Sequence, residues 1–552
     1  MVYTNVKLNI YNIAIGYKFS SIYAVILKKN RLKQKILLLK SQITLPLLSG
    51  LILTIAFPKL CYAWFIWFAF IPINIALCCA LPKKGFYYGF ICGYIHYLTL
   101  LYWLIHTFIN YAYFNWILAL LILLLFCAYL ALYFGIFFSL IAWLCSKPAT
   151  LLFLFPILWV ALEYIRSFLF SGFPWELIGY SQYANLYLIQ IADIFGVYGI
   201  SYLIAFFNVS IFLLFLYFTK KKWHGVLIEK QLVRYIFCSI IIIFGSVFLY
   251  NYFQINSLEK LFNNVKSIRA GIVQGNIEQL DKWEAKHQTI TIEKYINLSY
   301  KMKDDKPDIV IWPETALPFY YTYDVKLSKL VEEGIKKNET DFLVGSPSFT
   351  RDNDLIKYYN SAYLINAKGE PLGKYDKIHL VPFGEYVPIK NFLPFINKLV
   401  EGVVGDFSSG KIGQILNWNK CGIGVQICFE ILFPELSIAA VKNGAELIIT
   451  ITNDGWFGDT SAPYQHFSMA VFRAVENKRS LIRSANTGIS GFVNPIGKVL
   501  GMTDIFQDKT LLCELPIINK KTIYNQFGDV FAIFCVIIMI CCIIHKIIYI
   551  RR

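Results

Sequence analysis

Charged side chains are scarce in this chain, and acidic ones are almost missing from its first half. Only 16% of the 552 residues are charged, against about 25% in ordinary soluble domains. No acidic residue precedes Glu163, whereas 57% of all residues are hydrophobic. The composition is not that of a single water-soluble globule, and it predicts a membrane protein that carries one soluble domain.

The positive charge lacks the distribution that a nucleic-acid partner would need. The formal net charge is +17, of which +14 falls in residues 1–254, +1 in 255–525 and +2 in 526–552. The soluble part is therefore nearly neutral and offers no basic face. We predict no nucleic-acid partner, and we assign the excess of Lys and Arg to the membrane part.

Cysteine pairs and metal-binding spacings are missing as well. Of the 13 cysteines, only Cys421, Cys428 and Cys513 fall in the soluble part. If Cys421 and Cys428 share one strand, they lie roughly 23 Å apart at ~3.3 Å per residue, which is too far for a disulfide. No CxxC pair or Cys/His metal spacing occurs. We expect Cys428 to be a free thiol, and we predict neither a metal nor a cofactor.

The chain divides into four parts by composition: a basic extension at 1–41, a membrane part at 42–254, a soluble domain at 255–525, and a last span with a basic tail at 526–552. The extension has no small-residue cleavage site after an apolar run, so no removable signal peptide is predicted. Apolar runs of the length needed to cross a bilayer predict about eight spans. They lie near 42–57, 62–81, 87–108, 114–145, 150–169, 190–218, 233–253 and 527–547.

The distribution of Lys and Arg between the spans predicts an orientation. With the basic N-terminus in the cytoplasm, the inner connections carry most of the cations, for example Lys220–Lys222, while the outer ones carry only Lys59 and Arg166. By the positive-inside rule, this places 255–525 outside the cytoplasm. One outer connection, Phe170–Gln182, is rich in aromatic residues. It is either an interfacial aromatic loop or a platform on which the soluble domain or a lipid rests.

The soluble domain alternates short apolar runs with amphipathic ones, which is typical of an α/β sheet covered by helices. The stretch 383–410 holds aromatic residues among prolines and glycines, and we expect it to be a long loop that acts as a lid. The expected strands are 268–274, 308–312, 341–345, 361–366, 422–427, 446–452 and 489–493, and the expected helices are 281–302, 328–337, 434–443 and 463–483.

Cys428 ends the predicted strand Gly422–Ile427, and a helix begins shortly afterwards. A strand, a sharp turn and a helix are the arrangement that projects a nucleophile into the mouth of a fold. A lone cysteine is more often a buried core residue. Two further segments favour the nucleophile instead. One is a short apolar strand that ends in Glu314, and the other is a segment broken by proline and glycine that brings Lys377 and Glu385 together.

The chemistry of these side chains suggests a division of labour. Cys428 would attack an acyl carbon as a thiolate, Glu314 would act as general acid and base, and Lys377 would stabilise the oxyanion and lower the pKa of the thiol. Glu385 would orient Lys377 or hold the acceptor, and Glu430 is expected to point the same way as the thiol. A papain-like pair of Cys428 with His379 is disfavoured, because no partner Asn or Asp motif accompanies it.

The Glu–Lys–Cys set, carried by Trp312–Glu314, Tyr375–Lys377 and Gln426–Glu430, resembles the nitrilase (carbon–nitrogen hydrolase) superfamily. The membrane spans narrow the resemblance to the apolipoprotein N-acyltransferase family. Other segments that resemble this family are Gly172–Trp175, Gln274–Ile277, Val381–Pro388, Asn453–Asp459 and Arg483–Gly488.

This resemblance implies an α-β-β-α sandwich for the catalytic domain and a bacterial inner-membrane enzyme whose catalytic domain is periplasmic. It implies transfer of the sn-1 acyl chain of a glycerophospholipid, through a thioester on Cys428, to the N-terminal diacylglyceryl-cysteine of an apolipoprotein. It further implies a monomer, and supporting roles for Trp283 and Glu385. Phe429 stands where members of the family often carry Tyr.

Two alternatives differ in class from this interpretation. A membrane-tethered amidase or nitrilase acting on a small C–N substrate would use the same three residues but would need only one or two spans. A transporter with a large outer domain would need ionisable residues inside its spans, and few occur there, chiefly His96 and Asp193.

Overall fold

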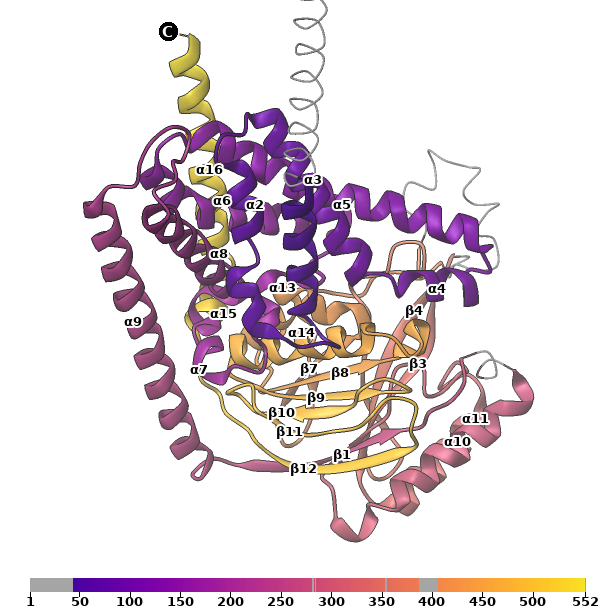
Figure 1. Cartoon of the computed structure of the whole chain (residues 1–552). Helices are drawn as coiled ribbons and strands as arrows, with labels where there is room; N and C mark the ends of the chain where they lie inside the picture. Colours follow the sequence, from indigo (N-terminus) through magenta and orange to yellow (C-terminus); the bar gives the residue numbers. More distant parts are fainter. Residues whose placement is uncertain (1–42, 280–281, 283, 353–354, 387–405, 552) are drawn as a thin grey trace, which may run out of the picture.

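The computed structural model describes residues 43–279, 282, 284–352, 355–386 and 406–551. A helical part, which holds the apolar runs, packs on one side of a domain built from two β-sheets (Figure 1). The predicted basic extension at 1–41 lies outside the described residues, and so does most of the predicted lid, at 387–405.

Each of the eight apolar runs falls on helical structure. The two runs nearest the N-terminus form short apolar helices, Ile43–Ile55 and Ala63–Leu77. The third run is a helix pair bent by 53° between α3 and α4. The longer helices of this part are α3 (Pro82–Leu100), α4 (Leu104–Asn110), α5 (Trp116–Leu144), α6 (Pro148–Phe168), α8 (Ala192–Phe218), α9 (Lys230–Phe262) and α16 (Val530–Arg551); the short ones are η1 (Ala63–Phe68), α2 (Ile71–Leu77), η2 (Leu169–Ser171), η3 (Ile178–Gln182), α7 (Leu186–Ile189) and α15 (Ile523–Phe527).

By length and apolar composition, five described helices could cross a membrane, and the bent α3–α4 pair would make a sixth. They differ in how much of their surface the protein itself covers. α8 is largely buried among its neighbours, whereas α9 and α16 leave most of their apolar side chains exposed or half-exposed. Apolar surface of this extent is typical of helices that face lipid.

The other part contains two six-stranded sheets. Their orders are β12-β1-β2-β3-β4-β5 and β11-β10-β9-β8-β7-β6. The first sheet consists of β1 (Ser267–Gln274), β2 (Ile309–Ile311), β3 (Asp341–Asp352), β4 (Leu355–Ile365), β5 (Pro371–Asp376) and β12 (Lys509–Pro516); the second consists of β6 (Leu416–Asn417), β7 (Gly422–Ile427), β8 (Leu447–Thr452), β9 (Ser480–Ala485), β10 (Gly491–Val493) and β11 (Val499–Met502).

The two sheets pack face to face, and helices cover both outer faces. Alternate residues along each strand, such as Ile309 and Ile311 or Leu447 and Ile449, form the apolar core between the sheets. Because side chains alternate across a strand, their neighbours face the helices instead. Val310 packs with α10 (Ala285–Tyr300) and α11 (Val325–Asn338), and Ile448 packs with α13 (Pro434–Lys442) and α14 (Ala462–Asn477). The α-β-β-α sandwich implied by the resemblance is therefore confirmed.

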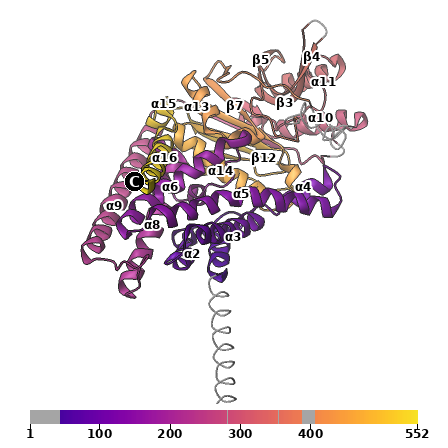
Figure 2. The same cartoon turned by 90° about the horizontal axis from the view of Figure 1, so that it is seen from above.

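The layer of α13 and α14 lies between the second sheet and the membrane part (Figure 1). Figure 2, turned by 90°, shows α10 and α11 on the side away from α2, α3 and α8. Buried residues of α14 and of the membrane helices, among them Phe472 and Val197, belong to one continuous apolar core. The soluble domain is thus fixed to the membrane part through α13 and α14.

One predicted helix was wrong at its end. The run 463–483 was expected to be helical throughout, but α14 ends at Asn477 and β9 begins at Ser480. Lys478, with φ +49°, caps the helix in the left-handed conformation. All six residues of β9 are buried because the strand lies inside the second sheet. Because α14 and β9 are both buried on all sides, the spacing of apolar residues does not show where the helix ends and the strand begins.

Besides β9, the strands β5, β6, β11 and β12 were not predicted, and β3 and β4 are longer than expected. These four strands are the edge strands of the two sheets. β12 is largely half-buried and pairs antiparallel with β1 over eight residues, from Ser267–Pro516 to Gln274–Lys509. A strand of this kind has little hydrophobic signal of its own, because its place depends on pairing with a distant segment.

Candidate active site

Cys428 lies in a sharp turn between β7 and the short helical turn η6 (Cys428–Leu432), with α13 directly after it. Its φ is +55°, in the left-handed region that non-glycine residues rarely adopt. Such backbone strain costs about 1–3 kcal/mol and gathers at functional sites. The side chain is 9% exposed. The predicted strand–turn–helix around Cys428 is confirmed.

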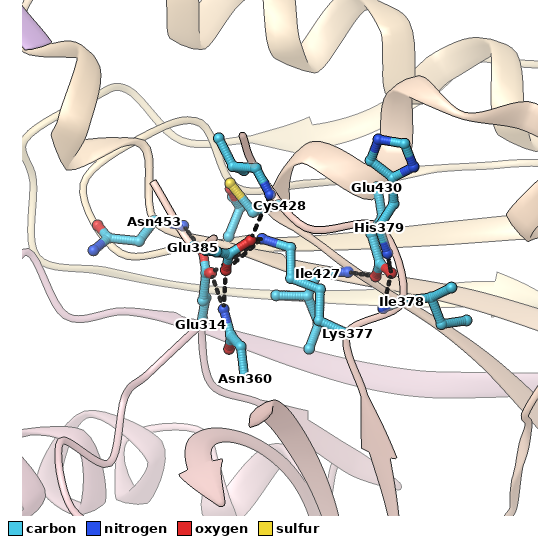
Figure 3. Close-up of polar contacts among 12 residues, drawn as sticks. Glu314, Asn360, Lys377, Ile378, His379, Glu385, Ile427, Cys428, Glu430 and Asn453 are labelled. Atoms are coloured by element: carbon cyan, nitrogen blue, oxygen red, sulfur yellow. Dashed lines mark hydrogen bonds and ion pairs between the residues drawn. The ribbon is translucent and has the colours of Figure 1, made fainter. Parts of the chain in front are cut away.

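Glu314 and Lys377 converge on Cys428 from the other sheet (Figure 3). Glu314 follows the end of β2, and Lys377 directly follows β5. The Lys377 Nζ atom lies 3.9 Å from Glu314 Oε1. Both side chains are buried. The site therefore lies where strand ends of the two sheets meet, as expected for ligand sites at strand ends in α/β folds.

Glu385, which was expected to orient Lys377 or to hold the acceptor, also lies in this group. Its carboxylate lies 2.9 Å from Lys377 Nζ and accepts a hydrogen bond of 2.9 Å from the backbone N–H of Val381. Asn360, which the sequence did not reveal, donates from Nδ2 to Glu314 at 2.7 Å and to Glu385 at 3.0 Å. Two carboxylates, one ammonium group and one amide thus form a closed network in a buried site.

Two further groups that the sequence did not reveal hold Glu314. The backbone N–H of Asn453 donates to Glu314 Oε2 at 2.9 Å, and Lys282 Nζ donates to the Glu314 carbonyl oxygen at 3.1 Å. Asn453 belongs to the segment Asn453–Asp459, which resembles the family. This resemblance was the only indication in the sequence that Asn453 lies near the site. Trp283, to which the resemblance assigned a supporting role, lies outside the described residues.

Burial dominates the electrostatics of the site. It raises the pKa of the Cys428 thiol to about 12; Glu314 adds to this rise, and Lys377 opposes it. Burial also raises the pKa of Glu314, and the Lys377 charge offsets part of that rise. Although burial alone would lower the pKa of Lys377, the carboxylates of Glu385 and Glu314 raise it above its ordinary value. Lys377 lowers the pKa of the Cys428 thiol, as expected, but burial outweighs this effect. The resting cysteine is therefore a thiol and not a thiolate.

Glu430 does not point toward the thiol group, contrary to expectation. Its carboxylate accepts hydrogen bonds from the backbone N–H groups of Ile427, Ile378 and His379 at 2.6, 2.6 and 3.1 Å, and from the Tyr375 hydroxyl at 3.0 Å. Figure 3 shows this cluster beside the network around Lys377. Glu430 therefore ties the turn at Cys428 to the segment that follows Lys377.

Phe429 and His379 form an aromatic group next to the thiol. The rings of Phe429 and Phe433 pack edge to face with centroids 5.3 Å apart, and His379 stacks on Phe433 at 3.6 Å. Burial and the Lys377 charge lower the pKa of His379 to about 4. His379 is thus a neutral, stacked ring. This agrees with the expectation that His379 and Cys428 do not form a papain-like pair.

The membrane part reaches the segment that follows Asn453. This segment is the short turn η7 (Asp454–Phe457). The Tyr111 hydroxyl donates to the Gly455 carbonyl oxygen at 2.8 Å, and Thr107 Oγ1 on α4 donates to the Trp456 carbonyl oxygen at 2.9 Å. The bend between α3 and α4 therefore places membrane-part residues against a loop that contributes to the site.

The connection 170–182 also contacts the soluble domain. Trp175 Nε1 donates to Gln465 Oε1 on α14 at 2.8 Å, and Ser468 Oγ donates to Glu176 at 3.2 Å. Both Trp175 and Glu176 are buried. Of the two alternatives for this connection, the structure favours a platform under the soluble domain over an exposed aromatic loop.

Two family descriptions match the chain. Residues 49–210 match "Apolipoprotein N-acyltransferase N-terminal domain" and residues 269–517 match "Carbon-nitrogen hydrolase". The chain is 41% identical over 490 residues to an apolipoprotein N-acyltransferase of Geobacter metallireducens, covering 89% of this chain and 92% of the relative. It is 31% identical to the apolipoprotein N-acyltransferase of Methylococcus capsulatus, covering 88% and 92%.

Among solved structures, a likeness is found to an amidase from Nesterenkonia sp. The identity is 19%, the match covers 48% of this chain and 94% of the amidase, and the TM-score is 0.35. The likeness is confined to about half of this chain, whereas the two relatives above extend through the membrane part as well.

Proposed function

The chain belongs to the apolipoprotein N-acyltransferase family, and we propose that it transfers the sn-1 acyl chain of a glycerophospholipid to the α-amino group of a diacylglyceryl-cysteine at the N-terminus of an apolipoprotein. The acyl group would pass through a thioester on Cys428. The observation that carries this proposal is the convergence of Glu314, Lys377 and Cys428, in a chain whose relatives match both the membrane part and the catalytic domain.

In the first step, Glu314 takes the proton of the Cys428 thiol as the sulfur attacks the ester carbonyl carbon. The tetrahedral intermediate carries a negative oxygen, which the Lys377 ammonium group stabilises. When the intermediate collapses, the ester C–O bond breaks, and Glu314 returns the proton to the glycerol oxygen. The products are a thioester on Cys428 and a lysophospholipid. The high pKa of the resting thiol favours proton transfer during the attack over a preformed thiolate.

In the second step, the α-amino group of the acceptor attacks the thioester carbonyl carbon. Glu314 takes a proton from the attacking nitrogen, and Lys377 again stabilises the oxyanion. The C–S bond breaks, the sulfur regains a proton, and an amide is released. Glu385 and Asn360 keep Lys377 and Glu314 in place through both steps, which supports a positioning role for Glu385.

Mass spectrometry of the intact protein tests this scheme. After incubation with phosphatidylethanolamine, the wild type should gain the mass of one fatty acyl group, and a diacylglyceryl-cysteine peptide should remove it. Cys428→Ala should show no gain. Cys513→Ala is the matched control, because Cys513 lies on β12 in the soluble domain and should leave the adduct unchanged. A folded wild type that gains no acyl group in the presence of lipid would refute the thioester mechanism.

The alternative, an amidase acting on a small C–N substrate, shares the three residues but leaves the membrane part without a role. Among the described residues, no feature of the site favours it. Hydrolysis of a soluble amide by the folded wild type, without an acyl adduct from phospholipid, would support that alternative.

We propose the four-part division of the chain given above, with eight spans and the catalytic domain on the periplasmic side of a bacterial inner membrane. The +14 charge of residues 1–254, concentrated in alternate connections, supports this orientation. Alkaline phosphatase fused after residue 264 should be active, and fusions after 222 or at the C-terminus should be inactive. The opposite pattern would refute the orientation.

We further propose that the enzyme acts as a monomer on its phospholipid and apolipoprotein substrates, without a nucleic-acid partner.

A further inference from the structure

His466 is a buried histidine on α14 for which the mechanism above has no role. Its Nε2 atom lies 3.2 Å from the backbone oxygen of Cys428. Its Nδ1 atom lies 2.9 Å from Arg483 Nη2 and 3.0 Å from Asp454 Oδ1. The side chain is 1% exposed. A ring held at both nitrogens has a fixed orientation.

The partner of Nε2 defines the proton on that atom. A carbonyl oxygen can only accept, so Nε2 must carry the proton that it donates to Cys428. Nδ1 lies between Arg483, which can only donate, and the Asp454 carboxylate, which can only accept; a neutral ring satisfies the first contact and a charged ring the second. Burial and the Arg483 charge lower the pKa of His466, whereas Asp454 opposes this shift. The Nε2–H donor is present in both forms of the ring. Asp454 pairs with Arg483 at 2.8 Å; although burial alone would raise its pKa, Arg483 and His466 lower it to about 2.

The carbonyl that His466 holds belongs to the strained residue itself. With φ at +55°, Cys428 needs surrounding contacts that over-determine its conformation. Glu430 accepts from the Ile427 N–H, which belongs to the peptide between Gln426 and Ile427, and His466 holds the peptide that follows Cys428. The two contacts fix the chain one residue before Cys428 and directly after it, and the direction of the thiol depends on both.

The membrane part supports the ring of His466. Trp175 stacks on it, with centroids 5.7 Å apart and planes inclined by 26°. Trp175 is itself fixed, because Nε1 donates to Gln465 and its carbonyl oxygen accepts from Arg166 at 3.2 Å. The loop that presents Trp175 adopts left-handed conformations at Gly172 and Glu176, with φ of 81° and 47°. At Gly172, a Cβ atom would lie 1.9 Å from the Ser167 carbonyl oxygen, so only glycine fits there.

We propose that His466 is a positioning residue for acyl transfer, whose Nε2–H group holds the Cys428 carbonyl and whose ring is held by Trp175 of the membrane part. The catalytic domain therefore has its productive cysteine geometry only when it is seated on the membrane part. This inference rests on the proposed function, because it concerns the rate at which Cys428 becomes acylated.

Two amide variants separate the hydrogen bond from mere packing. In His466→Gln, the amide nitrogen can reach the position of Nε2 and donate to the Cys428 carbonyl. In His466→Asn, the amide reaches only the position of Nδ1, so the carbonyl loses its donor. Single-turnover acylation of the full-length protein by phosphatidylethanolamine, followed by intact mass, gives the rate directly.

We expect His466→Asn to acylate about tenfold or more slowly than wild type, since small misplacements of reacting groups cost rates of this order. His466→Gln should stay within about threefold of wild type, and KM for the phospholipid should change in neither variant. Val471→Ala, a truncation of a buried residue on the same helix, controls for loss of packing and should keep the wild-type rate. Trp175→Leu should slow acylation as His466→Asn does, and the double variant should be no slower than the slower single variant.

Equal rates for the Gln and Asn variants would overturn the proposal, and so would a wild-type rate for His466→Asn. If His466→Asn fails to fold, the comparison of Trp175→Leu with His466→Gln decides: a wild-type rate for Trp175→Leu would refute the coupling to the membrane part. A wild type that never acylates would instead refute the proposed function, so the two failures are distinguishable.

Discussion

The Lys377 ammonium group lies 2.9 Å from both carboxylate oxygens of Glu385. Its distance to Glu314 is one ångström longer, at 3.9 Å. The charge of Lys377 is therefore neutralised first by Glu385, and its ion pair with Glu314 is the longer of the two. A carboxylate in this position keeps a raised pKa and can accept a proton from the thiol.

The pH dependence of acylation should follow Glu314. Only the ionised carboxylate can take the thiol proton, so the rate is full above the pKa of Glu314 and falls as the pH drops through it. Burial places this pKa above the ordinary glutamate value of about 4.3. Because the pKa of Cys428 is about 12, raising the pH from 7 to 9 adds almost no thiolate. The single-turnover rate, measured between pH 4 and 9, should show one acid limb and then a plateau. A rate that keeps rising in proportion to hydroxide up to pH 9 would contradict Glu314 as the base.

Glu385→Gln should slow acylation by about 10²-fold and move the acid limb to lower pH. Without the Glu385 charge, Lys377 pairs with Glu314, and Glu314 also loses a neighbour that raises its pKa. A Glu314 with a lower pKa is a weaker base, so acylation slows. The same lower pKa moves the acid limb to lower pH. The measurement is the single-turnover pH profile of the variant. Glu370→Gln, at an exposed carboxylate, should match wild type; an unshifted limb in Glu385→Gln would disprove the electrostatic role of Glu385.

Glu430→Gln should lower both stability and turnover. The Glu430 carboxylate accepts from three backbone N–H groups and one hydroxyl, and a glutamine places an NH₂ group against at least one of these donors. One buried donor without an acceptor costs about 1–3 kcal/mol. Unfolding in detergent should show this loss, and kcat should fall with little change in KM. Glu339→Gln, on an exposed side chain, is the control. Wild-type stability in Glu430→Gln would mean that these hydrogen bonds do not hold the turn at Cys428.

A buried ion pair joins α8 to the end of α14, and a double-mutant cycle can measure it. Lys478 Nζ lies 3.5 Å from Asp193, and both side chains are buried. Removing only one partner leaves a buried charge without its counterpart, which costs roughly 3–5 kcal/mol. Asp193→Leu should therefore destabilise the protein more than Asp193→Leu combined with Lys478→Met. The exposed pair Lys303 and Glu339 should show no measurable coupling in the same cycle. Additive effects at Asp193 and Lys478 would show that the pair contributes no specific link between the two parts.

The sequence was informative wherever local pattern decides structure. The strand Gly422–Ile427, the turn at Cys428 and the helix from Pro434 follow from residues that are neighbours in the chain, and all three were predicted. Glu314 was found because it follows a predicted strand, and Lys377 because it shares a segment broken by proline and glycine with a second carboxylate, Glu385. The apolar runs marked the membrane helices for the same reason, since length and hydrophobicity are local quantities.

Contacts between distant segments could not be predicted in this way. Asn360 bridges Glu314 and Glu385 only because β4 lies next to β5 and one strand away from β2 in the first sheet. Glu430 was expected beside the thiol, two residues away, but its carboxylate is drawn to the backbone N–H groups of a segment some 50 positions earlier. The long helix predicted at 463–483 ended early because the strand Ser480–Ala485 pairs on both sides within the second sheet.

The amino-acid sequence by itself determined the division into membrane and soluble parts, the α/β character of the soluble part, and three of the groups that perform the chemistry, because composition, periodicity and strand ends are properties of short stretches. Only the tertiary structure decided how these groups are held. The protonated state of Cys428 depends on its burial, and the raised pKa of Glu314 depends on its burial and on Glu385. The turn at Cys428 depends on His466 and, through it, on Trp175 of the membrane part. Each of these arises when residues far apart in the chain share a site from which water is excluded, where charges and hydrogen bonds are stronger than in solvent.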